Sequence, residues 1–116
     1  MADFQLELDE RGETLVAKLI GEASLATNDA MEHGLMGVYA RRPKYLVLDL
    51  SQLDFIASLA MGNLVSLQQR IVQRNGGWVR AAAANPDVRK AFEHARLDKL
   101  FDLADSVEDA LQRDPS

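Results

Sequence analysis

Tyr45-Leu46-Val47-Leu48-Asp49-Leu50 is the stretch that decides the fold, because it is a nearly continuous apolar run. Such a run is typical of a central strand that is covered on both faces, as in a parallel sheet. We expect a short loop over 51–56 and then a helix over 58–74, ended by Gly76-Gly77. A further strand, over 78–84, then completes a strand–helix–strand unit.

Two shorter strands precede this unit. Residues 4–8 alternate between apolar and polar side chains, which predicts a strand with one buried face and one wet face. Arg11-Gly12 is a turn signal, and residues 14–20 form the second strand, which Gly21 is expected to end. The two strands together predict a hairpin.

The remaining helices are marked by their first and last residues. Thr27 or Asn28 is expected to cap a helix that Pro43 stops, with Met31, Leu35 and Val38 as its buried stripe. Asn85 is expected to cap another helix, with Pro86 at its first position. The buried stripe of that helix is expected to be Val88, Ala91, Phe92 and Ala95. A short strand over 100–103 and a final helix opened by Ser106 are expected to follow.

This alternation predicts a single α/β domain with a mixed, mostly parallel β-sheet and four helices. A chain of 116 residues has the length of one ordinary domain. We place the domain at residues 1–112 and expect residues 113–116 to be a disordered tail.

Composition excludes several classes of protein. The 13 basic and 18 acidic residues give a net charge of -5, which argues against direct binding of nucleic acid. The chain has no cysteine, so it has no disulfide, thiol catalysis or cysteine-bound metal. No secretory signal is visible, and no apolar run approaches the ~18 residues of a membrane span. The expected location is therefore the cytoplasm.

No pattern in the sequence predicts an enzyme or a cofactor. His33 and His94 are the only histidines and lie far apart in sequence, so no metal site is expected. Gly76-Gly77 is not followed by a Lys-Ser/Thr pair, so it is not a phosphate-binding loop. Ser58 and His94 could be written into a catalytic triad, but no nucleophile-elbow glycines flank Ser58.

The helix predicted over 58–74 has an unusual polar side. Ser58, Gly62 and Ser66 follow one another at i, i+4 and i+8, which makes a surface of low relief. The backbone of another protein could approach such a surface closely. Leu59 projects on the same side and is a candidate apolar contact.

Ser58 has two compatible interpretations. Serine is a good N-cap, so helix physics predicts that Ser58 caps this helix. A helix N-terminus also tolerates a phosphate, which would add about -1.5 to -2 charges at this point. Residues 23–97 hold nine basic and six acidic residues, so the local effect would be large.

The order and spacing of several segments resemble the STAS domain of bacterial anti-sigma factor antagonists and sulphate transporter tails. The segments that carry the resemblance are Tyr45–Ser51, Leu53–Ile56, Ser58 with Gly62, Gly21-Glu22, Gly76-Gly77 and Leu97–Phe101. They extend over nearly the whole chain.

The resemblance implies a binding protein that works by partner switching. In that family an anti-sigma factor that is also a serine kinase binds the unmodified antagonist and phosphorylates it, and a serine phosphatase resets it. The matching phosphoacceptor is Ser58. Family members often read Asp-Ser-Ser/Thr-Gly here, whereas this chain has Ala57-Ser58-Leu59-Ala60. Ser24 stands where antagonists often carry an acid, and we include it among the partner-binding residues.

The expected site therefore comprises Ser58 as phosphoacceptor, with Ser58, Leu59, Gly62, Ser66 and Ser24 as partner contacts. A second interpretation stays open. The loss of the flanking acid is also typical of a STAS scaffold that docks permanently in a signalling or transport assembly, without phosphorylation.

Overall fold

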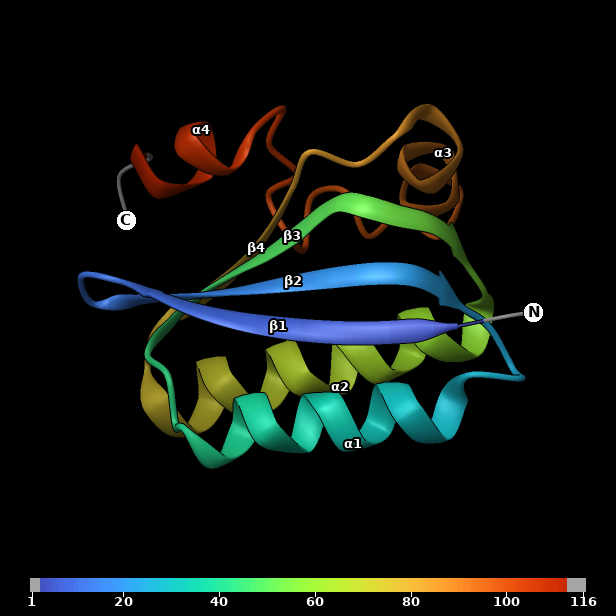
Figure 1. Cartoon of the computed structure of the whole chain (residues 1–116). Helices are drawn as coiled ribbons and strands as arrows, with labels where there is room; N and C mark the ends of the chain where they lie inside the picture. The colour runs from blue at the N-terminus through green and yellow to red at the C-terminus, as the bar shows by residue number, and fades with distance from the viewer. Residues whose placement is uncertain (1–2, 113–116) are drawn as a thin grey trace.

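A computed structural model describes residues 3–112 as a four-stranded sheet between two pairs of helices (Figure 1). The elements are β1 (Phe4–Arg11), β2 (Thr14–Ala23), α1 (Asn28–Ala40), β3 (Tyr45–Ile56), α2 (Ser58–Asn75), β4 (Trp78–Ala82), α3 (Pro86–His94) and α4 (Val107–Gln112). The strand order is β1-β2-β3-β4, with β1 antiparallel to β2 and the other two pairs parallel. The predicted fold class is confirmed.

The predicted hairpin of β1 and β2 is present, but β2 does not end at Gly21. The strand continues to Ala23, and Gly21 lies within it at a φ of +98°. The backbone carbonyl of Asp3 would overlap a Cβ at this position, so only glycine fits. The pairing of β2 with β3 shifts register next to Gly21.

The loop predicted over 51–56 is also wrong, because β3 extends without interruption to Ile56. Leu53 and Ile56 are buried and pair with Gly21 and Ala23 of β2. The second half of β3, after Leu50, contains exposed polar residues. This half does not pair with β4, because β4 pairs only with Tyr45–Asp49 of β3. β4 itself ends at Ala82, two residues earlier than predicted.

Two helices cover each face of the sheet. Figure 1 shows α1 and α2 side by side below it, and α3 and α4 above it. The predicted buried stripe of α1 is confirmed, and α2 buries Ala60, Leu64, Leu67 and Ile71. Val72, next to Ile71, is 37% exposed.

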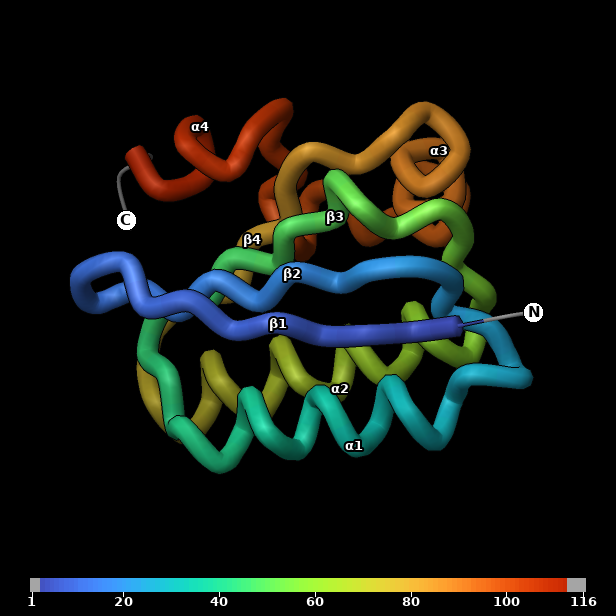
Figure 2. The backbone as a smooth tube through the Cα atoms, in the orientation of Figure 1, coloured from blue at the N-terminus to red at the C-terminus, as the bar shows by residue number. Residues whose placement is uncertain are grey.

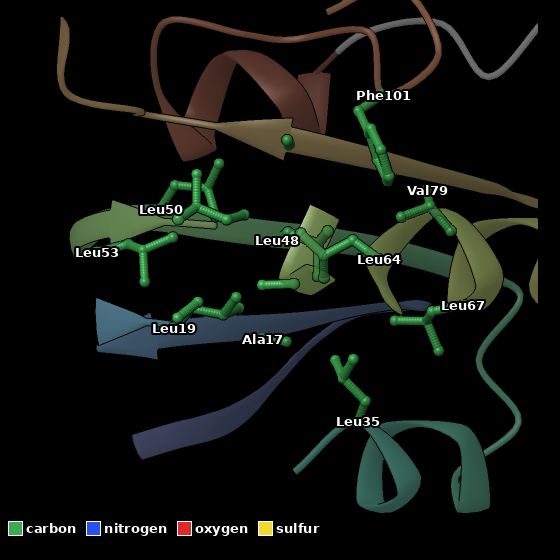
Figure 3. Close-up of a cluster of buried hydrophobic side chains, with 14 of the residues drawn as sticks. Ala17, Leu19, Leu35, Leu48, Leu50, Leu53, Leu64, Leu67, Val79 and Phe101 are labelled. Carbon is green, nitrogen blue, oxygen red and sulfur yellow. The ribbon is translucent and has the colours of Figure 1, made fainter. Parts of the chain in front are cut away.

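The main core fills the space between the sheet and α1 and α2 (Figure 3). Leu19 and Leu48 from the sheet and Leu64 from α2 are fully buried there. Burial of one such leucine contributes roughly 1.5–3 kcal/mol. The same cluster reaches α3, where the Phe92 ring meets Phe101 edge-on at 5.7 Å. A smaller cluster of short side chains holds α4 against the sheet.

The C-terminal third departs from prediction at two points. Residues 100–102 form turns and Leu103 is irregular, so no strand forms there; Ala104 alone bridges to the sheet, at Ala82. Ala95 was expected in the buried stripe of α3, but it follows the last helical residue and is exposed.

Both predicted caps of this region are confirmed. The Asn85 side chain accepts a 2.8 Å hydrogen bond from the Val88 N–H at the start of α3. At the start of α4, Ser106 Oγ accepts from the Asp109 N–H at 3.0 Å. The tail predicted at 113–116 lies outside the described residues. Within residues 3–112, no helix is long and apolar enough to span a bilayer.

Candidate partner-binding site

The site is built at the end of the sheet where β2 and β3 finish. Both strands run in the same direction, so the loops to α1 and α2 leave the sheet at the same end (Figure 2). The Ala57 N–H donates a 2.8 Å hydrogen bond to the Ala23 carbonyl oxygen. Ser24 and Ser58 each follow one of these two residues, so the junction brings together two predicted site residues from separate segments.

Ser58 is the first residue of α2 and is exposed. The prediction that it caps the helix is wrong, because Ala57 takes the cap position with an extended backbone (φ -91°, ψ 163°). Ala57 continues the extended path of β3, so the helix begins one residue too early for a serine cap. No side chain caps α2, and the Ser58 hydroxyl is therefore not used for capping.

Thr27 braces the loop that carries Ser24. It stands at the cap position of α1, as predicted, but its side chain makes no cap hydrogen bond. Its hydroxyl oxygen instead accepts from the Ser24 N–H at 2.9 Å and donates to the Glu22 carbonyl oxygen at 2.7 Å. Asn63 of α2 donates to Asn28 of α1 at 2.9 Å, which ties the starts of the two helices together.

The row Ser58, Gly62 and Ser66 is exposed along α2, but it does not face one direction. Ser58 borders a pocket between α2 and α3, whereas Ser66 borders a groove between α1 and α2. Each four-residue step advances about 40° around a helix, and this drift turns Ser66 toward α1. A Cβ added at Gly62 would meet nothing within 4 Å, so this part of the surface is open.

Exposed large apolar residues are found in both segments of this junction. Leu59 is 47% exposed, as the sequence predicts for a contact on the polar side. Leu25, 78% exposed, follows Ser24, and Phe55, 50% exposed, precedes Ala57 by two residues. Sequence reasoning missed Leu25 and Phe55. The sequence feature that could have revealed Leu25 is its position as an isolated large apolar residue in a loop of small residues.

The pocket beside Ser58 has a volume of about 560 Å³. Phe55 and Met61 line it from β3 and α2, and Ala91 and His94 line it from α3. The first turn of α2 contains no acidic residue. Among residues 3–112, no group of three histidine or acidic side chains is placed to hold a metal ion.

Comparisons with known proteins agree with this architecture. The sequence profile of the STAS domain matches residues 5–110. The anti-sigma-F factor antagonist RsfB of Mycobacterium tuberculosis is 32% identical over 96 residues, covering 83% of this chain and 77% of RsfB. An anti-sigma F factor antagonist of Paenibacillus polymyxa is 24% identical over 94% of this chain and 93% of its own length.

A solved structure extends the comparison to three dimensions. The crystal structure of an anti-sigma factor antagonist from Mycobacterium paratuberculosis superposes with a TM-score of 0.84 and 26% identity. The match covers 94% of this chain and 92% of that one. On sequence and fold together, the chain belongs to the STAS domain family, among the bacterial anti-sigma factor antagonists.

Proposed function

We propose that the chain binds an anti-sigma factor that is a serine kinase, and that phosphorylation of Ser58 ends this binding. The observation that carries the proposal is the exposed, non-capping Ser58 at the first position of α2. Exposed Leu59 and Phe55 lie beside it in sequence and offer a partner apolar contact area.

A phosphate at this place opposes docking for a simple reason. Contacts with Leu59 and Phe55 require the partner to exclude water from the surface around Ser58. A phosphate carries about -1.5 to -2 charges and resists desolvation, which costs about a few kcal/mol of binding free energy. The unmodified serine has no such cost, so only that form binds.

The modification itself is carried out by the kinase. The γ-phosphoryl group of ATP passes to Ser58 Oγ, so a P–Oγ bond forms and the bond to the ADP leaving group breaks. A base of the kinase takes the hydroxyl proton. A serine phosphatase hydrolyses the phosphoserine to restore the hydroxyl, and the exposed position of Ser58 leaves both enzymes room to reach it.

The test is incubation of the chain with candidate kinases and ATP, followed by peptide mapping. We expect one phosphate, on Ser58, and none in Ser58→Ala. The matched controls are Ser24→Ala and Ser66→Ala, which remove the other two serines of the site and should leave modification intact. Phosphate mapped consistently to another residue contradicts the proposal.

A second function is supported by a different observation. Ala57 and Leu59 flank Ser58, and the first turn of α2 has no acidic residue, so the surface is more apolar than the family pattern. Such a surface also suits a scaffold that docks permanently. A stable stoichiometric complex that survives Ser58→Asp unchanged supports the scaffold, and weakening of the complex by this substitution supports the switch.

A further inference from the structure

We infer that His94 binds the phosphate of phosphorylated Ser58 across the pocket between α2 and α3. This inference rests on the proposed modification of Ser58, and it adds a receptor for the phosphate within the same chain. It also gives His94 a role that the sequence did not suggest, since the two residues are 36 positions apart.

The two side chains border the same space. Ser58 lines the pocket of about 560 Å³ from the first turn of α2, and His94 lines it from the last turn of α3. Figure 1 shows α3 lying across the same end of the sheet as the start of α2. The other lining residues are apolar: Phe55, Ile56, Ala57, Met61, Ala91 and Ala95. Among the side chains that line the pocket, His94 is thus the one able to donate a hydrogen bond to a phosphate.

The charges around the pocket favour this contact. An imidazole ring nitrogen can donate a hydrogen bond to a phosphate whether the ring is neutral or charged, and a phosphoserine carries about -1.5 to -2 charges. No carboxylate lines the pocket to repel the phosphate. The charged residues next in sequence to the lining residues are Asp54, Lys90, Glu93 and Arg96. None of them lines the pocket.

The position of His94 leaves its ring accessible. His94 is the last residue of α3 and is exposed. The contact would draw the phosphate of the modified form toward α3. In the unmodified form the hydroxyl gives His94 no anion to bind, so the arrangement distinguishes the two states.

The test uses the full chain with phosphoserine placed at position 58 by genetic encoding. Phosphorus NMR follows the second ionisation of the phosphate against pH in the wild type, in His94→Gln and in His33→Gln. A nearby imidazolium stabilises the dianion, so the midpoint in the wild type should lie at least about 0.3 pH unit below that of His94→Gln. His33 is exposed on α1 and is the matched control, so His33→Gln should titrate as the wild type does.

A second readout needs no variant. Installing phosphoserine should shift the side-chain resonances of His94 and leave those of His33 in place. Equal midpoints in all three proteins, with both histidines unmoved, overturn the contact. If His94→Gln fails to fold, the histidine resonances of the wild type decide alone.

The Ser58 switch and the His94 contact can each be contradicted without contradicting the other. The phosphate is introduced without a kinase and no partner is present, so a negative result here removes only the role of His94. A kinase screen that never modifies Ser58 removes the proposed switch and leaves the measured contact as a property of the pocket.

Discussion

The Ala57 N–H donates a 2.8 Å hydrogen bond to the Ala23 carbonyl oxygen, joining the end of β2 to the residue that precedes α2. Ala23 also pairs in the sheet with Ile56, so the two chain segments stay together up to the first turn of the helix. Backbone pairing therefore holds the two segments of the site together. Ser24 follows Ala23 and Ser58 follows Ala57, so this backbone hydrogen bond places the two serines at one junction.

The first prediction follows from the cap of α2. Because Ala57 holds the cap position, Ser58→Ala should change the free energy of unfolding by less than about 0.5 kcal/mol. Asn85→Ala is the comparison, since Asn85 accepts from Val88 and also donates to the Leu53 carbonyl oxygen at 3.0 Å. That substitution should cost about 1–2 kcal/mol in urea denaturation. Equal losses in the two variants would contradict the helix start described here.

Gly62 gives the second prediction. A Cβ there meets nothing within 4 Å, and alanine is the better helix former, so Gly62→Ala should stabilise the fold by up to about 1 kcal/mol. Gly37 of α1 is equally open, and Gly37→Ala should stabilise to a similar degree. If a partner backbone approaches α2 at Gly62, only Gly62→Ala should weaken its binding, measured by calorimetry. Unchanged affinity would remove Gly62 from the contact surface.

The apolar residues around Ser58 give the third prediction. Leu59→Ala and Phe55→Ala should each weaken partner binding by about 1–2 kcal/mol, since each removes exposed apolar surface that the partner would bury. Leu100→Ala is the control: it is the same residue type as Leu59, 41% exposed, and it lies in the turns after α3. Surface plasmon resonance on the three variants would decide, and an equal effect of Leu100→Ala would count against a localised surface.

Arg80 gives the fourth prediction, on stability. The buried guanidinium donates to the Ala110 carbonyl oxygen at 2.8 Å and lies 3.9 Å from the centre of the Trp78 ring. Arg80→Ala leaves that carbonyl without this donor, so we expect a loss of about 2–4 kcal/mol and faster hydrogen exchange in α4 than in α1.

Arg89→Ala is the matched control for Arg80→Ala. Arg89 pairs with Asp105 at 2.9 Å on the surface, where such an ion pair contributes at most about 1 kcal/mol. Equal rates of hydrogen exchange in α1 and α4 of the Arg80→Ala variant would show that Arg80 does not stabilise α4.

The sequence predicted the layers of the fold because its periodicities are strong. The central run of β3 specifies a strand buried on both faces, and the alternation in β1 and the stripe of α1 each specify one buried face; all three are confirmed. The ends of elements were predicted less well. Gly21 and the polar residues after Leu50 look like breaks, yet pairing with a neighbouring strand keeps both segments extended.

The site was predicted in part for the same reason. Local spacing placed Ser58, Leu59 and Gly62 on the exposed side of one helix, which the structure bears out. Contacts between distant segments were invisible to spacing. The pairing of Ala23 with Ala57 and the pocket shared by Ser58 and His94 depend on how α1, α2 and α3 pack on the sheet.

The central claim is that a phosphate on Ser58 controls partner binding. The most direct measurement is the dissociation constant, by calorimetry, of a serine-kinase anti-sigma factor for two forms of the chain, with serine and with phosphoserine at position 58. We predict that phosphoserine weakens binding by at least about 2 kcal/mol, or roughly thirtyfold. Dissociation constants of the two forms that agree within about twofold would contradict the account.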